Sequence, residues 1–159
     1  WSLGGQLALE IGYVLEQKEL ININIHLLDT IIQDEYLISL SNKKDEVEFN
    51  QKIREYMISE GYEDDYVKKV MRASKAEKEI SKQPISGTLK SSKVVLFKAL
   101  QEDKRIDYEG REQVHKYTQF LKDNNVGQFV KDLEVINLNC NHGNILDYVI
   151  ANDKYSNLL

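Results

Sequence analysis

The chain is poor in the residues that mark several classes of protein. Its 159 residues include one cysteine, one proline and one tryptophan. A single cysteine, Cys140, excludes a disulfide within the chain and favours a reducing compartment such as the cytoplasm. No apolar run reaches the roughly 18 residues of a membrane-spanning helix, and the first residues do not resemble a signal peptide. We therefore expect a cytoplasmic protein without a membrane partner.

The sequence also lacks a cluster of basic residues. Charged residues make up 30% of the chain and the formal net charge is −5. A protein that binds nucleic acid through its phosphates needs a positively charged surface, so we expect no nucleic-acid partner. The length is sufficient for one domain, or the larger part of one, with a real hydrophobic core.

The first residues resemble a nucleophile elbow, a sharp turn between a strand and a helix that presents a reactive serine. Ser2 is followed by Leu3, Gly4 and Gly5, and small residues are needed beside such a serine because a Cβ would collide with a neighbouring element. Ser2 is therefore the candidate nucleophile. The alternative is an ordinary solvated loop, since serine and glycine are common in turns.

The residues after this turn predict a helix and then a strand. Apolar residues recur every three or four positions as far as about Lys18, which predicts an amphipathic helix. Residues 20–28 alternate isoleucine and leucine with polar residues, which predicts a strand. Asp29 ends that strand. In a parallel sheet, reactive groups gather beyond the carboxyl ends of the strands, which makes Asp29 the candidate acid.

A histidine late in the chain would complete a serine, acid and histidine triad in the order typical of this elbow. His142 follows a strand-like segment at 133–138 and a polar turn at 139–141, and a helix-like run at 145–150 comes next. A histidine on such a loop can take the serine's proton while a carboxylate orients its other nitrogen. The alternative for His142 is a capping or turn role. We expect His26 to be a structural residue of its strand and His115 to lie on the surface of a helix at 108–122.

Three segments support a resemblance to a known family. The sequence WSLGGQLALEI at 1–11, the strand end LLDT at 27–30, and Asn141-His142 followed by Ile145 and Leu146 resemble the thioesterase domains that terminate nonribosomal peptide synthetases. Trp1 favours this integrated class, because free-standing editing thioesterases more often have Gly-His-Ser-Met-Gly at this point. The chain differs from the family before His142, where Asn139, Cys140 and Asn141 replace a glycine-containing lead-in.

The resemblance implies a function and a set of roles. Ser2 would accept a peptidyl or acyl chain from the phosphopantetheine arm of a carrier protein domain, and water or an internal nucleophile would release it. His142 would act as base and acid, Asp29 would orient it, and the backbone amide of Leu3 would bind the oxyanion. No metal and no diffusible cofactor is expected. The alternatives are an editing thioesterase or other esterase of the same fold, and a non-catalytic interaction fragment.

The expected fold class is α/β, as the C-terminal part of an α/β-hydrolase. A parallel sheet edge of about three strands, with the second at 93–99, would be flanked by helices. Residues 42–82 predict two amphipathic helices joined near Gly61, in the position of a lid; a plain helical hairpin is the alternative. Residues 1–159 would then form one incomplete domain. We expect its first strand to pair with the missing N-terminal half or a second copy, and the isolated chain to have little activity.

Overall fold

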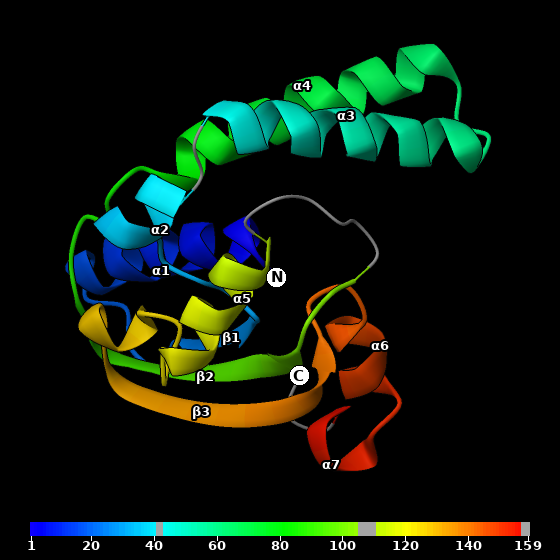
Figure 1. Cartoon of the computed structure of the whole chain (residues 1–159). Helices are drawn as coiled ribbons and strands as arrows, with labels where there is room; N and C mark the ends of the chain where they lie inside the picture. Colours follow the sequence, from blue (N-terminus) through cyan, green and yellow to red (C-terminus); the bar gives the residue numbers. More distant parts are fainter. Residues whose placement is uncertain (41–42, 105–110, 157–159) are drawn as a thin grey trace. The chain divides into compact units, whose positions relative to one another are not determined.

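The computed structural model describes residues 1–40, 43–104 and 111–156, and the chain divides into two compact units (Figure 1). We call the first the sheet unit and the second the helical unit. The sheet unit contains Trp1–Ile32, Pro84–Asp103 and Leu121–Leu159, and the helical unit contains Gln33–Gln83 and Lys104–Phe120.

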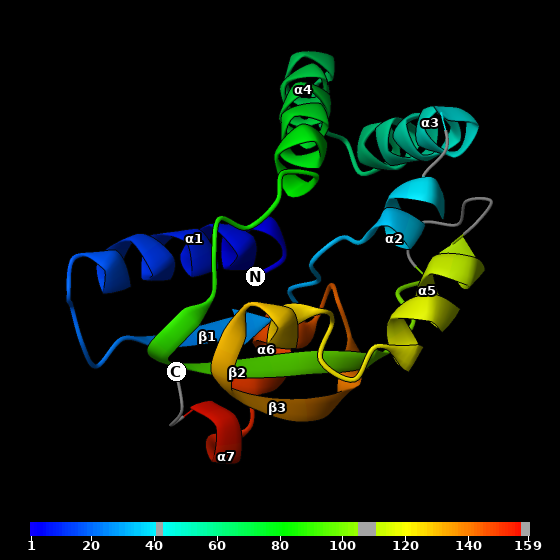
Figure 2. The ribbon, with the colours of Figure 1, turned by 90° about the vertical axis from the view of Figure 1, so that its left-hand side faces the viewer.

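Three parallel strands form the centre of the sheet unit. They are β1 (Asn24–Leu28), β2 (Leu89–Gln101) and β3 (Val130–Asn141), and they lie side by side in that order (Figures 1 and 2). The predicted α/β class with a small parallel sheet flanked by helices is confirmed. Because all three strands run the same way, their carboxyl ends meet at one edge of the sheet.

Helices cover both faces of this sheet. Helix α1 (Leu3–Gln17) packs Leu9 against Leu27 and Leu96 on one face. On the other face Phe97 and Leu138 pack with α6 (Ile145–Ile150), which is followed by α7 (Asp153–Ser156). The centre of β2 is buried on both sides, since Leu96 and Phe97 are each 0% exposed. This burial explains the almost continuous apolar run in the sequence of β2.

The strands differ from the sequence prediction at their ends. Residues 20–23 were expected to be strand, but β1 begins only at Asn24, because Asn22 has a left-handed backbone with φ of 62°. Residues 139–141 were expected to form a polar turn, but they continue β3. The buried side chain of Cys140 accounts for this difference, since it packs among the apolar residues beneath α6.

The helical unit contains four helices within its described residues. They are α2 (Glu35–Leu40), α3 (Lys43–Ser59), α4 (Asp64–Ser81) and α5 (Arg111–Phe120). The two helices predicted in 42–82 are confirmed as α3 and α4, with Gly61 at φ of 85° in the turn between them; residue 42 lies outside the described residues. No described helix has both the length and the apolar character needed to cross a membrane.

Helix α5 belongs to the helical unit and not to the sheet. We expected a helix at 108–122 to connect the last two strands across the sheet, and its residues 108–110 lie outside the described ranges. The Tyr117 hydroxyl donates to Asp34 Oδ2 at 2.6 Å, and the Tyr117 ring lies 4.5 Å from that of Tyr36. These contacts pack α5 with α2, so the chain leaves the sheet unit between β2 and β3.

One carboxylate joins the end of α1 to the start of β2. Glu16 accepts hydrogen bonds from the backbone N–H groups of Lys90, Ser91 and Ser92, at 2.8, 3.0 and 2.7 Å, and from the Ser92 hydroxyl at 2.6 Å. Burial by itself raises the pKa of Glu16, but these hydrogen bonds outweigh it and lower the pKa to about 2. The charged form of Glu16 therefore holds the first strand residues of β2 in place.

We expect Glu16→Gln to lower the free energy of unfolding by about 1–3 kcal/mol at neutral pH, because an amide offers one acceptor in place of a carboxylate. The folded-state pKa of Glu16 is depressed, so its contribution is present above the unfolded value of 4.5 and is lost as the pH falls toward about 2. Chemical denaturation at several pH values should show the difference from wild type narrowing over that range. Glu19→Gln, an exposed change nearby, should have no such effect; equal loss in both variants would contradict the assignment.

Candidate functional site

Asp29 is the centre of the candidate site. It follows β1 directly, and its backbone N–H donates to Phe97 O at 2.8 Å. Asp29 is 7% exposed, and both oxygens of its carboxylate have hydrogen-bond partners. Oδ1 accepts from Ala99 N at 3.1 Å and from Asn124 Nδ2 at 3.2 Å, while Oδ2 lies 2.9 Å from His142 Nδ1. The structure thus joins the candidate acid and the candidate histidine by a direct hydrogen bond.

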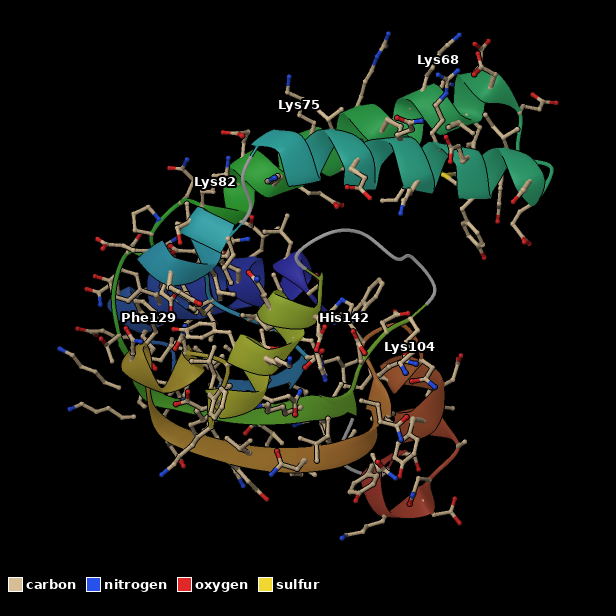
Figure 3. All side chains as sticks on the ribbon, in the orientation of Figure 1. Lys68, Lys75, Lys82, Lys104, Phe129 and His142 are labelled. Atoms are coloured by element: carbon tan, nitrogen blue, oxygen red, sulfur yellow. The ribbon has the colours of Figure 1, made fainter. Side chains whose placement is uncertain are left out.

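His142 lies in the turn between β3 and α6 (Figure 3). Asn141 shapes that turn, because its Oδ1 accepts from the N–H groups of Gly143 at 3.0 Å and Asn144 at 3.1 Å. A further hydrogen bond joins the same two residues, because Asn144 Oδ1 accepts from Asn141 N at 2.9 Å. Asparagine side chains therefore define the backbone of this turn, and the turn brings His142 to Asp29.

The contact with Asp29 determines the tautomer of His142. A carboxylate accepts hydrogen bonds only, so Nδ1 carries the proton and Nε2 keeps its lone pair when the ring is neutral. The His142 side chain is 36% exposed, and no hydrogen bond to Nε2 is present among the described residues. This is the arrangement in which an imidazole can accept a proton from a neighbouring group.

Ser2 has a backbone conformation that is unusual for a residue other than glycine. Its φ is 51° and its ψ is −128°, and it stands directly before the first residue of α1. Such conformations cost about 1–3 kcal/mol and concentrate at functional positions. The Ser2 N–H donates to Leu28 O at 3.2 Å, which places Ser2 beside the residue that precedes Asp29. The N–H of Leu3 donates no hydrogen bond among the described residues, as expected at a helix start.

Gly5 permits this close approach of α1 to the end of β1. An ideal Cβ on Gly5 would lie 1.9 Å from Thr30 Oγ1 and 2.8 Å from Thr30 Cβ, distances that no side chain tolerates. A Cβ on Gly4 would meet nothing within 4 Å. The second glycine after the serine is therefore required by packing, which is the reason we gave for small residues beside a nucleophile elbow.

The three predicted residues are not joined in one chain of hydrogen bonds. Asp29 and His142 are in contact, but no hydrogen bond links Ser2 Oγ to the His142 ring within the described part of the chain. The neighbouring Trp1 does contact the histidine: its ring stacks on that of His142 with centroids 5.2 Å apart. Two contacts therefore hold the chain at Ser2: the preceding residue, Trp1, stacks on His142, and the Ser2 N–H donates to Leu28 O. Catalytic hydrogen bonds are often long or absent until substrate binds.

Sequence reasoning missed Asn124, which donates to the acid. Asn124 and Asn125 are both left-handed, with φ of 52° and 63°. Their loop pairs with the chain after Asp29, because Ile32 N donates to Asn124 O at 3.0 Å and Asn125 Nδ2 donates to Ile32 O at 3.1 Å. Two adjacent asparagines predict a turn, but nothing in the sequence indicates which carboxylate one of them would contact.

Two other ionisable groups lie near Asp29 and are buried. Cys140 is 1% exposed, and burial first, then the negative charge of Asp29, raise the pKa of its thiol to about 11. Cys140 therefore stays protonated at neutral pH and is a packing residue, as expected. Lys98 is 3% exposed; burial lowers its pKa, while Asp29 and Asp123 partly oppose this. The Lys98 ammonium donates to the backbone oxygen of Leu121.

The other two histidines lie elsewhere. His26 is half-buried in β1, with its ring edge-on to Phe97 at 6.4 Å, which confirms its structural role. His115 lies on α5 in the helical unit and is half-buried. Across the described residues, no group of three or more histidine, cysteine, aspartate or glutamate side chains is placed to hold a metal ion.

Comparison with protein-family models, with curated proteins and with solved structures found no match to this chain.

The contact between Asn124 and Asp29 predicts a loss of stability. We expect Asn124→Ala to lower the free energy of unfolding by about 2–4 kcal/mol, because Asp29 loses a buried donor and alanine is strained at φ of 52°. Asn22→Ala is the matched control: Asn22 is exposed and has φ of 62°, so it carries the backbone cost alone. Equal losses in the two variants, measured by urea denaturation, would show that the amide contributes nothing.

Proposed function

We propose that this chain carries the nucleophile, acid and histidine of a serine acyltransferase or hydrolase of the α/β-hydrolase type. The observation that carries the proposal is the hydrogen bond of 2.9 Å between His142 Nδ1 and Oδ2 of the buried Asp29 carboxylate, whose Oδ1 accepts from Ala99 N and Asn124 Nδ2. The proposed nucleophile is Ser2, which has a strained backbone and lies directly before α1, beside the end of β1. In a parallel sheet these positions belong to the carboxyl edge, where reactive groups gather.

The proposed reaction has two steps, acylation of Ser2 and release of the acyl group, and the same residues act in both. Ser2 Oγ attacks the carbonyl carbon of the acyl donor while its proton passes to His142 Nε2. The carbonyl oxygen becomes an oxyanion, which the N–H of Leu3 stabilises as one of two donors; in the resembled family the second comes from a loop ahead of the nucleophile. The carbonyl re-forms, the leaving thiol takes the proton from His142, and an ester on Ser2 remains. Water, or a nucleophile within the acyl chain, then attacks the ester and gives its proton to His142. His142 returns a proton to Ser2 Oγ, and the product leaves.

The substrate class rests on the resemblance. Under it, the acyl donor is a peptidyl or acyl thioester on the phosphopantetheine arm of a carrier protein domain, and no other cofactor takes part. The segment WSLGGQLALEI at 1–11 supports the chain-terminating class over an editing thioesterase or a soluble esterase. In this proposal α3 and α4, which lie between the acid and the next strand in the sequence, act as the lid of the site.

Replacement of Ser2 by alanine tests the nucleophile. In the full chain we expect Ser2→Ala to abolish covalent labelling by a serine-directed fluorophosphonate, because in this proposal Ser2 carries the hydroxyl that His142 activates. His142→Ala should slow labelling by at least about 10²-fold, as the base is removed. Ser91→Ala, an exposed serine of β2, is the control and should label like wild type. Labelling that persists in Ser2→Ala, measured by intact mass, would exclude Ser2 as the nucleophile.

We also propose that a second copy of this chain pairs a strand with the outer edge of β1. β1 pairs with β2 on one side, and within the described residues its other edge receives one hydrogen bond, from Ser2 N to Leu28 O. Helix α1 also exposes Leu7, Ile11 and Val14, at 46%, 59% and 49%. An unpaired edge and an exposed apolar stripe both favour association.

Light scattering on the isolated chain tests this pairing, and we expect self-association. Along β1, alternate residues direct their backbone N–H and C=O groups toward β2. Ile23 and Asp29 bond to β2 in this way, whereas the backbone groups of Leu28, and of His26 two residues earlier, point to the outer edge. His26→Pro removes an outward N–H without removing a bond to β2, so it should reduce association. His26→Ala removes the same ring and keeps that N–H, so it should associate like wild type. A monodisperse wild-type monomer would contradict the proposal.

A further inference from the structure

Trp1 makes two contacts with His142 that the triad does not require. Its ring stacks on the imidazole, with centroids 5.2 Å apart and an angle of 28° between the planes. Its Nε1–H also donates to the backbone oxygen of His142 at 3.2 Å. The first contact covers one face of the histidine ring, and the second holds the backbone of the residue that carries it.

These contacts restrict motions that Asp29 leaves open. The hydrogen bond from Nδ1 to Asp29 Oδ2 fixes one atom of the ring, and the ring can still tilt about that atom. A flat indole against the imidazole opposes the tilt, because tilting opens a gap and loses contact between the two rings. The direction of Nε2 is therefore set by Trp1 and Asp29 together.

Burial of Trp1 does not explain its placement. The residue is 57% exposed, so most of its indole remains in water and contributes little to the core. Its contacts to His142 are an aromatic stacking and a hydrogen bond to the backbone, so the placement of Trp1 follows from His142 and not from the core.

We infer that Trp1 is a positioning residue for His142, one that holds the ring so that Nε2 faces the group whose proton it accepts. The role in catalysis rests on the proposed function, whereas the contact itself can be measured without any reaction. Trp1 is suited to this measurement because it is the sole tryptophan of the chain.

The first experiment follows Trp1 fluorescence in the full chain, with excitation where tyrosine does not absorb. A protonated imidazole in contact with indole quenches its emission more strongly than a neutral one. We expect the emission to fall once the pH is low enough to protonate the His142 ring. His142→Asn should abolish this step, and His115→Asn, a change in the helical unit, should keep it. A step that survives in His142→Asn, or is missing from wild type, would overturn the inference.

The second experiment measures the rate of fluorophosphonate labelling of Ser2 in the full chain. We expect Trp1→Leu, which removes ring and donor, to lower the rate about ten-fold through misplacement of His142. Trp1→Phe restores a ring without the donor and should recover part of the loss. Phe120→Leu, at an 83% exposed position, is the control and should have no effect.

The two experiments separate the inference from the proposed function. If wild type is labelled and Trp1→Leu is labelled at the same rate, the positioning role is overturned and Ser2 remains the nucleophile. A fluorescence step without any labelling of wild type would overturn the proposed function, and the positioning role in catalysis with it, while the contact of Trp1 with His142 would stand. Labelling that slows in Trp1→Leu and partly recovers in Trp1→Phe supports both.

Discussion

The buried carboxylate of Asp29 is the constraint on which the rest of the candidate site depends. A carboxylate removed from water is costly unless donors replace the lost hydration. Here Ala99 comes from β2, Asn124 from the loop before β3, and His142 from the turn after β3. These segments lie far apart in the sequence and meet at Asp29 only when the parallel sheet has formed. Folding of the sheet and assembly of the acid and histidine pair are therefore one event.

All the residues of the candidate site belong to the sheet unit. Trp1 and Ser2 begin it, and Asp29, Asn124 and His142 follow in its other segments. The helical unit departs after the acid at Gln33 and again at Lys104, so its helices are inserted at two points of the chain. The contacts of the acid and the histidine are thus complete within one compact unit. The inserted segments can then vary in sequence without disturbing these contacts, as insertions in surface connections generally can.

Much of this arrangement could be predicted from local patterns, and the rest depended on contacts between distant residues. Alternating isoleucines before Asp29 predicted β1, and a second strand was predicted at 93–99, within β2. Residues 139–141 were expected to form a turn because two of the three are asparagine, whereas the structure continues β3 through them, with Cys140 buried beneath α6. Nothing in the sequence indicated that Asn124 contacts Asp29, since the two residues are 95 positions apart. A sequence shows which residues favour a turn but not which carboxylate the turn contacts.

The structure of the acid and histidine pair differs from that of a buried ion pair that only stabilises a fold. A purely structural pair gains most when both partners are enclosed, yet Asp29 is enclosed while the His142 side chain is 36% exposed. Both carboxylate oxygens have partners, whereas Nε2 of the histidine has no hydrogen bond among the described residues. Ser2 also has a strained backbone conformation, of the kind that concentrates at functional positions. An acid held fast, a ring open on one side and a strained serine at the adjacent helix start together favour proton transfer over a structural role.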